Sequence, residues 1–252
     1  MTCIVVLVRC HLLRLIFVSE IFYNYKFDFP DGDQKQFHVD FDKTKLQSNV
    51  ISENHYPDWA QLEFNQCNIC PLTSEESLYC PLIVNLVPII YWCKDLASYD
   101  EVNVTVTSLE REVRAQTTLT RAVSSLLGLL MSSSACPKMK FLRPMARFHL
   151  PFATHEETLF RSVSASFLSN YFNNNENISD DDVLIELKQQ YKELQDLNRF
   201  IAERIRCAIK RDAAVNAIVL LDVLSKRVSF SIDDSLQSIR YIFENGEKPD
   251  IG

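Results

Sequence analysis

Glycine is scarce in this chain, and several short motifs on which common activities depend are missing with it. Only 4 of the 252 residues are glycine, so few positions suit the tight turns and phosphate cradles that need a positive φ. No phosphate loop, dinucleotide fingerprint, zinc-protease motif or nucleophile elbow occurs. These absences remove the familiar nucleotide-binding and hydrolase signatures and favour a helix-rich chain.

An excess of basic residues is also missing. The chain has 26 Lys and Arg against 33 Asp and Glu, a net charge of -7 and a pI near 5.3. Binding to nucleic acid depends on neutralising phosphates, usually with a basic stripe or patch, and the basic residues here are scattered. We therefore expect no nucleic-acid partner. With 47% hydrophobic residues the chain can bury an ordinary core.

The apolar stretch MTCIVVLVRCHLLRLIFVS, residues 1 to 19, is interrupted by Arg9, His11 and Arg14. A membrane span needs about 20 mostly apolar residues, and each central Arg costs roughly 2.5 to 3.5 kcal/mol. A signal peptide would carry its charges before the apolar run and a small-residue cleavage site after it. We expect no stable membrane span. We assign residues 1–20 to an extension outside the domain. Two interpretations of this stretch stay open: it is a buried strand or helix, or the start codon is misassigned.

Two pairs of alternating segments predict β-hairpins. FYNYKFDF and QKQFHVDFD flank the turn PDGD, in which Gly32 supplies a positive φ, and EVNVTVT and REVRAQT are joined around residues 108 to 110. Between the pairs, residues 82 to 96 predict a buried helix that Pro88 kinks or ends. The predicted fold class is α+β, a single domain over residues 21–245. Its sheet-forming part is 21–117 and its helical part is 118–245.

The second half carries clear helix signals. Residues 119 to 131 form an apolar segment closed by three serines. Thr154 with Glu157, and Ser179 with Asp182, open two further helices, the first reaching about residue 172. On the second of these, one face is apolar at helical spacing: Leu187, Tyr191, Leu194, Ile201 and Ile205. Residues 213 to 224 are apolar nearly all round and predict the most buried helix, in which Leu220→Ala should cost about 2 to 5 kcal/mol. A last helix is expected from Ser231 to about residue 245.

Four of the eight cysteines predict a metal site. Cys67, Cys70 and Cys80 lie in QCNICPLTSEESLYCP, Cys136 lies in SSSACP, and the last three are each followed by proline. Disulfide scaffolds are usually shorter and richer in cysteine, so we expect a reducing cytoplasm. Four converging thiolates suit tetrahedral zinc or the corners of an iron-sulfur cluster. The expected cofactor is therefore zinc or an iron-sulfur cluster, with a structural or redox-regulatory role.

Two alternatives stay open. The CxxC pair, Cys67 and Cys70, could be a redox dithiol, although that chemistry usually sits in a βαβ unit and these hairpins look antiparallel. The segment FLRPMARFHLPFATHEETLFR could instead form an enzyme pocket near Arg143–Arg161 that binds an anion or transfers protons. Its polar residues are Arg143, Arg147, His149, His155, Glu156, Glu157 and Arg161. Helix capping accounts for both glutamates, and His149 is either structural or a substitute metal ligand.

The combination of LEFNQCNICPL, YCPL, SSLLGLLMSSSACP, FLRPMARFHLPFATHEETLFR and NAIVLLDVL resembles an uncharacterised bacterial family of cytoplasmic proteins, a domain of unknown function. The resemblance covers roughly residues 22 to 245 and matches all four predicted cysteine ligands. At Cys67 the next residue is Asn68, where the family pattern suggests proline. The resemblance implies the domain boundaries and the four-cysteine site, and it implies no reaction.

Overall fold

The computed structural model describes residues 21–42, 44–48, 56–173, 178–208, 215–219, 221–222, 236–237 and 239–243. Three expectations fall outside these ranges wholly or in part. They concern the extension at residues 1–20, the position of Leu220, and most of the helix expected to follow Ser231.

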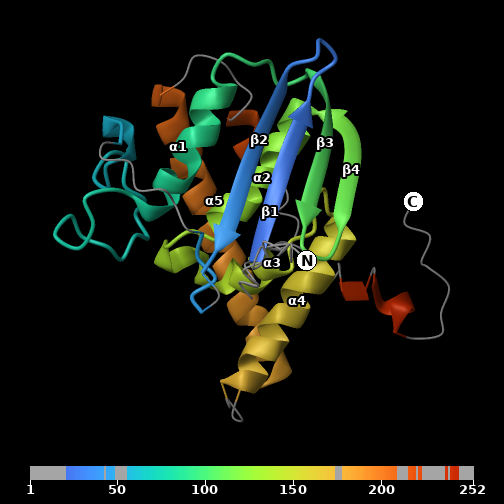
Figure 1. Ribbon diagram of the computed structural model, residues 1–252. Coiled ribbons are helices and arrows are strands. Elements are labelled where there is room, and N and C mark those ends of the chain that lie inside the picture. The colour runs from blue at the N-terminus through green and yellow to red at the C-terminus, as the bar shows by residue number, and fades with distance from the viewer. Residues whose placement is uncertain are drawn as a thin grey trace, which may run out of the picture.

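Four strands form one antiparallel sheet, shown in Figure 1. They are β1 (Ile21–Asp28), β2 (Gln34–Phe41), β3 (Glu101–Ser108) and β4 (Glu112–Thr118), in the order β2-β1-β3-β4. Both predicted hairpins are present, and Gly32 has the expected positive φ of 95°. The pairing of β1 with β3 joins the hairpins into a single sheet, with Tyr25 opposite Val106. The α+β fold class is confirmed.

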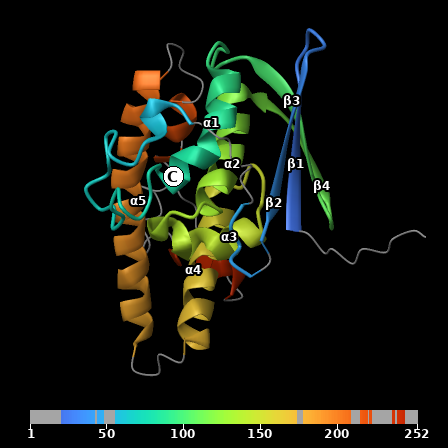
Figure 2. The same ribbon diagram turned by 60° about the vertical axis from the view of Figure 1, so that its left-hand side comes forward.

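One face of this sheet is apolar and the other is largely open to solvent. Because side chains alternate along a strand, every second residue of β1 and β3 points to the same side. The buried ones are Tyr23, Tyr25, Phe27, Val102, Val104 and Val106. Helices α1 (Pro81–Cys93) and α2 (Leu119–Ser132) lie against the sheet, as Figure 2 shows. Trp92 of α1 contacts the ring of Phe27, with centroids 4.9 Å apart.

Helix α1 begins at the proline that follows Cys80 and continues through Pro88. Proline suits the first helical position because its missing N–H would have no partner there. Pro88 is exposed and the helix continues past it, so of the two expected outcomes, a kink or an end, the end at this residue is wrong. The apolar residues on either side of Pro88 keep the helix in place by packing inward, since Leu86, Ile89 and Ile90 are fully buried.

Helices α4 (His155–Phe172) and α5 (Asp180–Ala208) lie side by side and extend below the sheet layer (Figures 1 and 2). The capping box is confirmed: Thr154 N–H donates to Glu157 Oε2 at 2.7 Å, and Glu157 N–H donates to Thr154 Oγ1 at 3.2 Å. All five residues of the predicted apolar face of α5 are buried. Short elements complete the described chain: η1 (Asp58–Ala60), η2 (Pro137–Leu142), α3 (Arg143–Arg147) and η3 (Arg240–Ile242).

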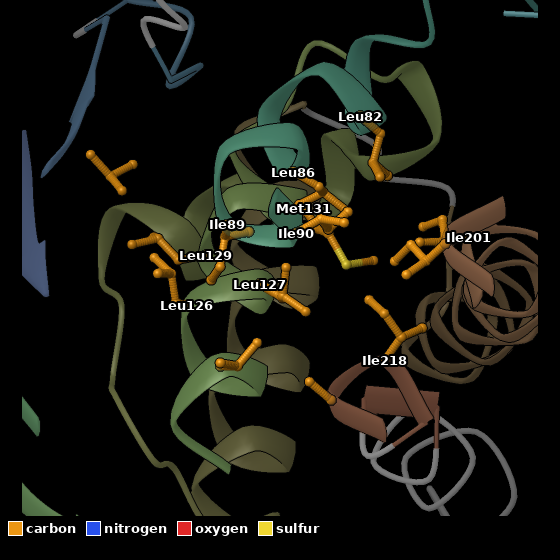
Figure 3. Close-up of a cluster of buried hydrophobic side chains, with 14 of the residues drawn as sticks. Leu82, Leu86, Ile89, Ile90, Leu126, Leu127, Leu129, Met131, Ile201 and Ile218 are labelled. Carbon is orange, nitrogen blue, oxygen red and sulfur yellow. The ribbon is translucent and has the colours of Figure 1, made fainter. Parts of the chain in front are cut away.

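Part of the core lies where α1 and α2 meet α5 and residues 215–219 and 221–222, drawn in Figure 3. Leu127 and Met131 of α2 face Ile201 and Ile218 in this view. Ile218 is fully buried, but Val219 is 42% exposed. The composition predicts a helix that is buried on all sides, whereas this segment has one side exposed to solvent.

Among the described residues, no single helix has both the length and the apolar composition needed to cross a membrane. Within these residues, α2 and the segment Pro137–Arg147 have the required length and composition only when they are taken together, and that pair is bent by 111°.

Replacing Leu127 tests this core. The side chain is fully buried, so Leu127→Ala removes apolar contacts and leaves a cavity, and we expect it to lower the free energy of unfolding by about 2 to 5 kcal/mol. The matched change Leu168→Ala, at a residue of α4 that is 55% exposed, should alter stability by less than about 0.5 kcal/mol. Urea unfolding of the three proteins measures both values. Equal effects of the two substitutions would show that Leu127 is not a core residue.

Candidate functional site

The loop between η1 and α1 carries three of the four predicted ligands, and backbone hydrogen bonds close its base. Cys80 N–H donates to Ala60 O at 2.9 Å, and Leu62 N–H donates to Leu78 O at 2.9 Å. Within the loop, Cys70 N–H donates to Cys67 O at 3.0 Å, so the CxxC pair forms a single turn. The start and the end of the cysteine motif are thereby brought together.

Cys136 reaches the same region from the end of α2. Here the predicted run of serines stops the helix, because Ser133 and Ser134 turn their hydroxyls back onto the carbonyls of Leu129 and Met131, both at 2.7 Å. Cys136 follows as the N-cap of η2 and is 6% exposed. Its carbonyl accepts from Met139 N–H at 3.1 Å, which fixes the first turn of η2.

All four predicted cysteines line one cavity of about 30 Å³, closed on its far side by residues of α5. We call it the thiol cavity. Across the described part of the chain, no three His, Cys, Asp or Glu side chains are already arranged so that they could hold a metal ion. The four thiols thus face a shared space without forming a finished ligand set. Coordination would require the cysteine side chains to rearrange around one point.

The thiols also affect one another electrostatically. Burial, and after it the neighbouring Cys70, Cys136 and Cys80, raises the pKa of Cys67 to about 12. Burial raises the pKa of Cys136 to about 11, with smaller contributions in the same direction from Cys80 and Cys70. Each of these two thiols is therefore protonated near neutral pH when nothing is bound, and a metal would have to displace the protons.

Arg204 of α5 supplies the cavity with a buried positive charge. It is 3% exposed, and its guanidinium donates to the carbonyls of Gln61 at 2.9 Å and Leu62 at 3.2 Å. Burial lowers its pKa, whereas the anionic forms of Cys80, Cys67 and Cys70 would raise it. No carboxylate within the described residues forms an ion pair with it. The groups that can neutralise Arg204 are accordingly the thiolates.

The second candidate segment, Arg143–Arg161, lies on a different cavity. His149 lines a space of about 420 Å³ between α2, α3, α4 and α5, together with His155 and Arg161. Because His149 does not line the thiol cavity, it is not a substitute for a cysteine ligand. Glu156 and Glu157 lie in the first turn of α4, where Glu157 completes the capping box. Arg147 makes a 3.8 Å ion pair with Glu110, at the end of the second hairpin.

Two tyrosines of β1 hold the loop that contains His149. Tyr23 donates its hydroxyl proton to Arg147 O at 3.0 Å and accepts from His149 N–H at 3.0 Å. The Tyr25 hydroxyl hydrogen-bonds both His149 Nε2 and Ser125 Oγ. Burial, and after it the charge of Arg161, lowers the pKa of His149 to about 3. His149 is thus neutral near pH 7 and engaged in a structural network.

Two polar residues that line the cavities are not evident from the sequence motifs. Arg204 could have been found, because it follows Leu197 by seven residues and Ile201 by three on one face of α5. A charge therefore interrupts a buried apolar face. Asn198, which lines the larger cavity and is 1% exposed, could not have been separated from the exposed polar residues around it. Its role depends on which helices pack against α5.

The neutral state of His149 gives a pH-dependent stability. An unfolded histidine has a pKa of about 6.5, so below that pH the unfolded chain takes up a proton that the folded protein does not. Stability is then lost as pH falls from about 6.5 toward 3, by at most about 1.4 kcal/mol per pH unit, and this contribution is constant above about pH 7.

His149→Gln, which keeps an acceptor for Tyr25, isolates this effect. We expect the stability advantage of the unaltered protein over the variant to be smaller at about pH 5 than at about pH 8. Urea unfolding of both proteins at the two pH values measures the difference. Parallel pH dependence in the two proteins would mean that His149 is protonated as readily in the folded state as in the unfolded one.

Comparison with known proteins adds a family and no activity. No match was found among curated proteins or among solved structures. A family model described as "Domain of unknown function (DUF6901)" matches residues 23–244, which include both hairpins, the thiol cavity and the larger cavity. The chain belongs to this family of unknown function.

Proposed function

We propose that Cys67, Cys70, Cys80 and Cys136 bind one zinc ion, which fixes the loop between η1 and α1 to η2. The observation that carries this proposal is that Cys136, which is distant in sequence, lines the same small cavity as Cys67, Cys70 and Cys80. A space of about 30 Å³ suits a single ion. An iron-sulfur cluster of four irons and four sulfides fills a larger space than one ion, so zinc is favoured over a cluster.

The charges around the cavity support the same choice. Zinc with four thiolates carries a net charge of about -2, and burying such a centre is costly unless positive charge or hydrogen-bond donors lie close to it. Arg204 brings one positive charge to this cavity without a carboxylate partner in the described chain. Arginine and centre would therefore neutralise each other in part, and each would offset the desolvation of the other.

A zinc ion enclosed by four sulfurs has no open position for a substrate. The proposed role is therefore structural, because the energy of metal binding contributes directly to folding of the loop. Regulation by oxidation is compatible with the same site, since oxidised thiols no longer hold zinc. The free cysteines suit a reducing compartment, and we propose a bacterial cytoplasmic protein.

A redox dithiol is less well supported. Reactive dithiols need a thiol whose pKa is lowered, whereas burial and the neighbouring thiols raise that of Cys67 to about 12. The CxxC turn also lies in a loop that precedes α1, and the sheet is antiparallel instead of containing a βαβ unit. A dithiol formed by Cys67 and Cys70 would not explain why Cys136 and Arg204 line the same cavity.

Metal analysis of the purified protein tests the proposal. Protein prepared without oxygen should contain about one zinc per chain, and Cys136→Ser should lose most of it together with part of its stability. Cys93→Ser is the matched control, because Cys93 is fully buried in α1 and lies outside the thiol cavity. It should retain its zinc.

Elemental analysis, the visible spectrum and thermal melting are the measurements. Brown protein with bound iron would show that the same four cysteines hold an iron-sulfur cluster and not zinc. Protein that carries no metal after expression in zinc- and iron-supplemented medium, with Cys136→Ser no less stable than Cys93→Ser, would overturn the four-cysteine site.

The charge of Arg204 provides a second test. Arg204→Met removes the positive charge but keeps an apolar side chain of similar length, and we expect zinc affinity to fall by about tenfold or more, whereas Arg204→Lys should lose less. Arg206→Met, at an exposed position of the same helix, is the control. Competition with a chromogenic chelator measures the affinities. Unchanged affinity in Arg204→Met would mean that this guanidinium only holds the carbonyls of Gln61 and Leu62.

A further inference from the structure

The larger cavity is of the size and composition typical of a small-molecule site. Its volume of about 420 Å³ lies within the range of roughly 300 to 1,000 Å³ found for ligand pockets. Helices α4 and α5 form one side, α2 another, and η2 with α3 closes the end. Much of the lining is apolar and flexible, with Met131, Met139 and Met145 among it. Methionine side chains adapt their shape readily to apolar ligands.

At one position in this lining there is a cation without a carboxylate partner. Arg161 of α4 donates through Nη2 to Met145 O at 2.8 Å and to Phe148 O at 2.7 Å, which holds the guanidinium against the cavity wall. Within the part of the chain that the structure describes, no Asp or Glu forms an ion pair with it. A partly buried guanidinium in this state favours an anionic ligand group such as a carboxylate.

At another position there is a buried acceptor without a donor. Asn198 of α5 is 1% exposed and lines the cavity, and its Oδ1 has no hydrogen-bond partner in the described structure. Such an oxygen costs about 1 to 3 kcal/mol if it stays unpaired. Buried polar atoms are nearly always satisfied in folded proteins, so an orphan on a residue that lines a cavity favours a ligand with an N–H or O–H at that place.

The distance between these two polar positions follows from helix geometry. Tyr191 lies on α5 close enough to Arg161 for each to shift the pKa of the other. Asn198 follows Tyr191 by seven residues on the same face, which corresponds to about 10.5 Å along the helix axis. Leu194 lines the cavity between them. The wall formed by α5 is therefore polar, apolar and polar in turn over about 10 Å.

We propose that this cavity binds an amphipathic organic carboxylate whose carboxylate pairs with Arg161 and whose far end donates a hydrogen bond to Asn198. The ligand has an apolar body of about ten carbons, matched to the helix spacing. This site is separate from the thiol cavity, and the proposal does not rest on the metal. Of the two histidines that line this cavity, His149 and His155, the first has its Nε2 already engaged with Tyr25.

Three related probes distinguish the two polar contacts in isothermal titration calorimetry. We expect ω-hydroxydecanoate to bind most tightly, decanoate about five- to tenfold more weakly because Asn198 stays unpaired, and the corresponding α,ω-diol not detectably. Arg161→Gln should remove binding of both carboxylates, and Arg161→Lys should restore part of it.

Asn198→Leu gives the sharpest result. Removing the orphan oxygen should raise the melting temperature of the free protein while lowering its affinity for ω-hydroxydecanoate to that for decanoate. Gln189→Leu, an amide-to-leucine change at an exposed position of α5, should change neither affinity. Circular dichroism and urea unfolding of each variant show whether it is folded.

Two results would overturn the proposal. One is the absence of saturable binding for all three probes. The other is binding that neither Arg161→Gln nor Asn198→Leu changes in folded protein.

Discussion

The one-sided sheet is the constraint on which the arrangement of the molecule depends. Four antiparallel strands present Tyr23, Tyr25 and Phe27, with the valines of β3, on a single face, and that face must be covered. Helices α1 and α2 cover it, and their own outer sides are then covered by α5 (Figure 2). The thiol cavity and the larger cavity both lie at this second boundary, where helices from distant parts of the chain meet.

The polar groups at this boundary are unlike those of the surface, because they face cavities and lack ordinary partners. Arg204 and Arg161 are held by backbone carbonyls and have no carboxylate partner in the described chain. A buried cation costs free energy unless it is paired, so a fold that keeps two of them is expected to gain something else. The anionic occupants proposed above, thiolates around a metal in one case and a carboxylate in the other, would account for both.

Local signals in the sequence predict the local structure well. Alternation and Pro-Asp-Gly identify the hairpins, and Thr154 with Glu157 identifies the start of α4, because each signal acts over a few residues. The pairing of β1 with β3 is long-range and has no such signal. The four cysteines could be grouped because thiolate ligands recur in characteristic spacings. Asn198 could not, because its chemistry arises only from the cavity that α2 and α4 form beside it.

The two cavities share a short physical connection. Cys136, the N-cap of η2, lines the thiol cavity, and Met139, three residues later, lines the larger one. The N–H of Met139 donates to the carbonyl of Cys136, so one turn of helix links a proposed metal ligand to the wall of a proposed ligand site. A metal that fixes Cys136 would also restrict Met139 and so lower the entropy lost when a ligand orders that wall. Under the two proposals together, the position of η2 would make the metal a means of preparing the larger cavity for its ligand.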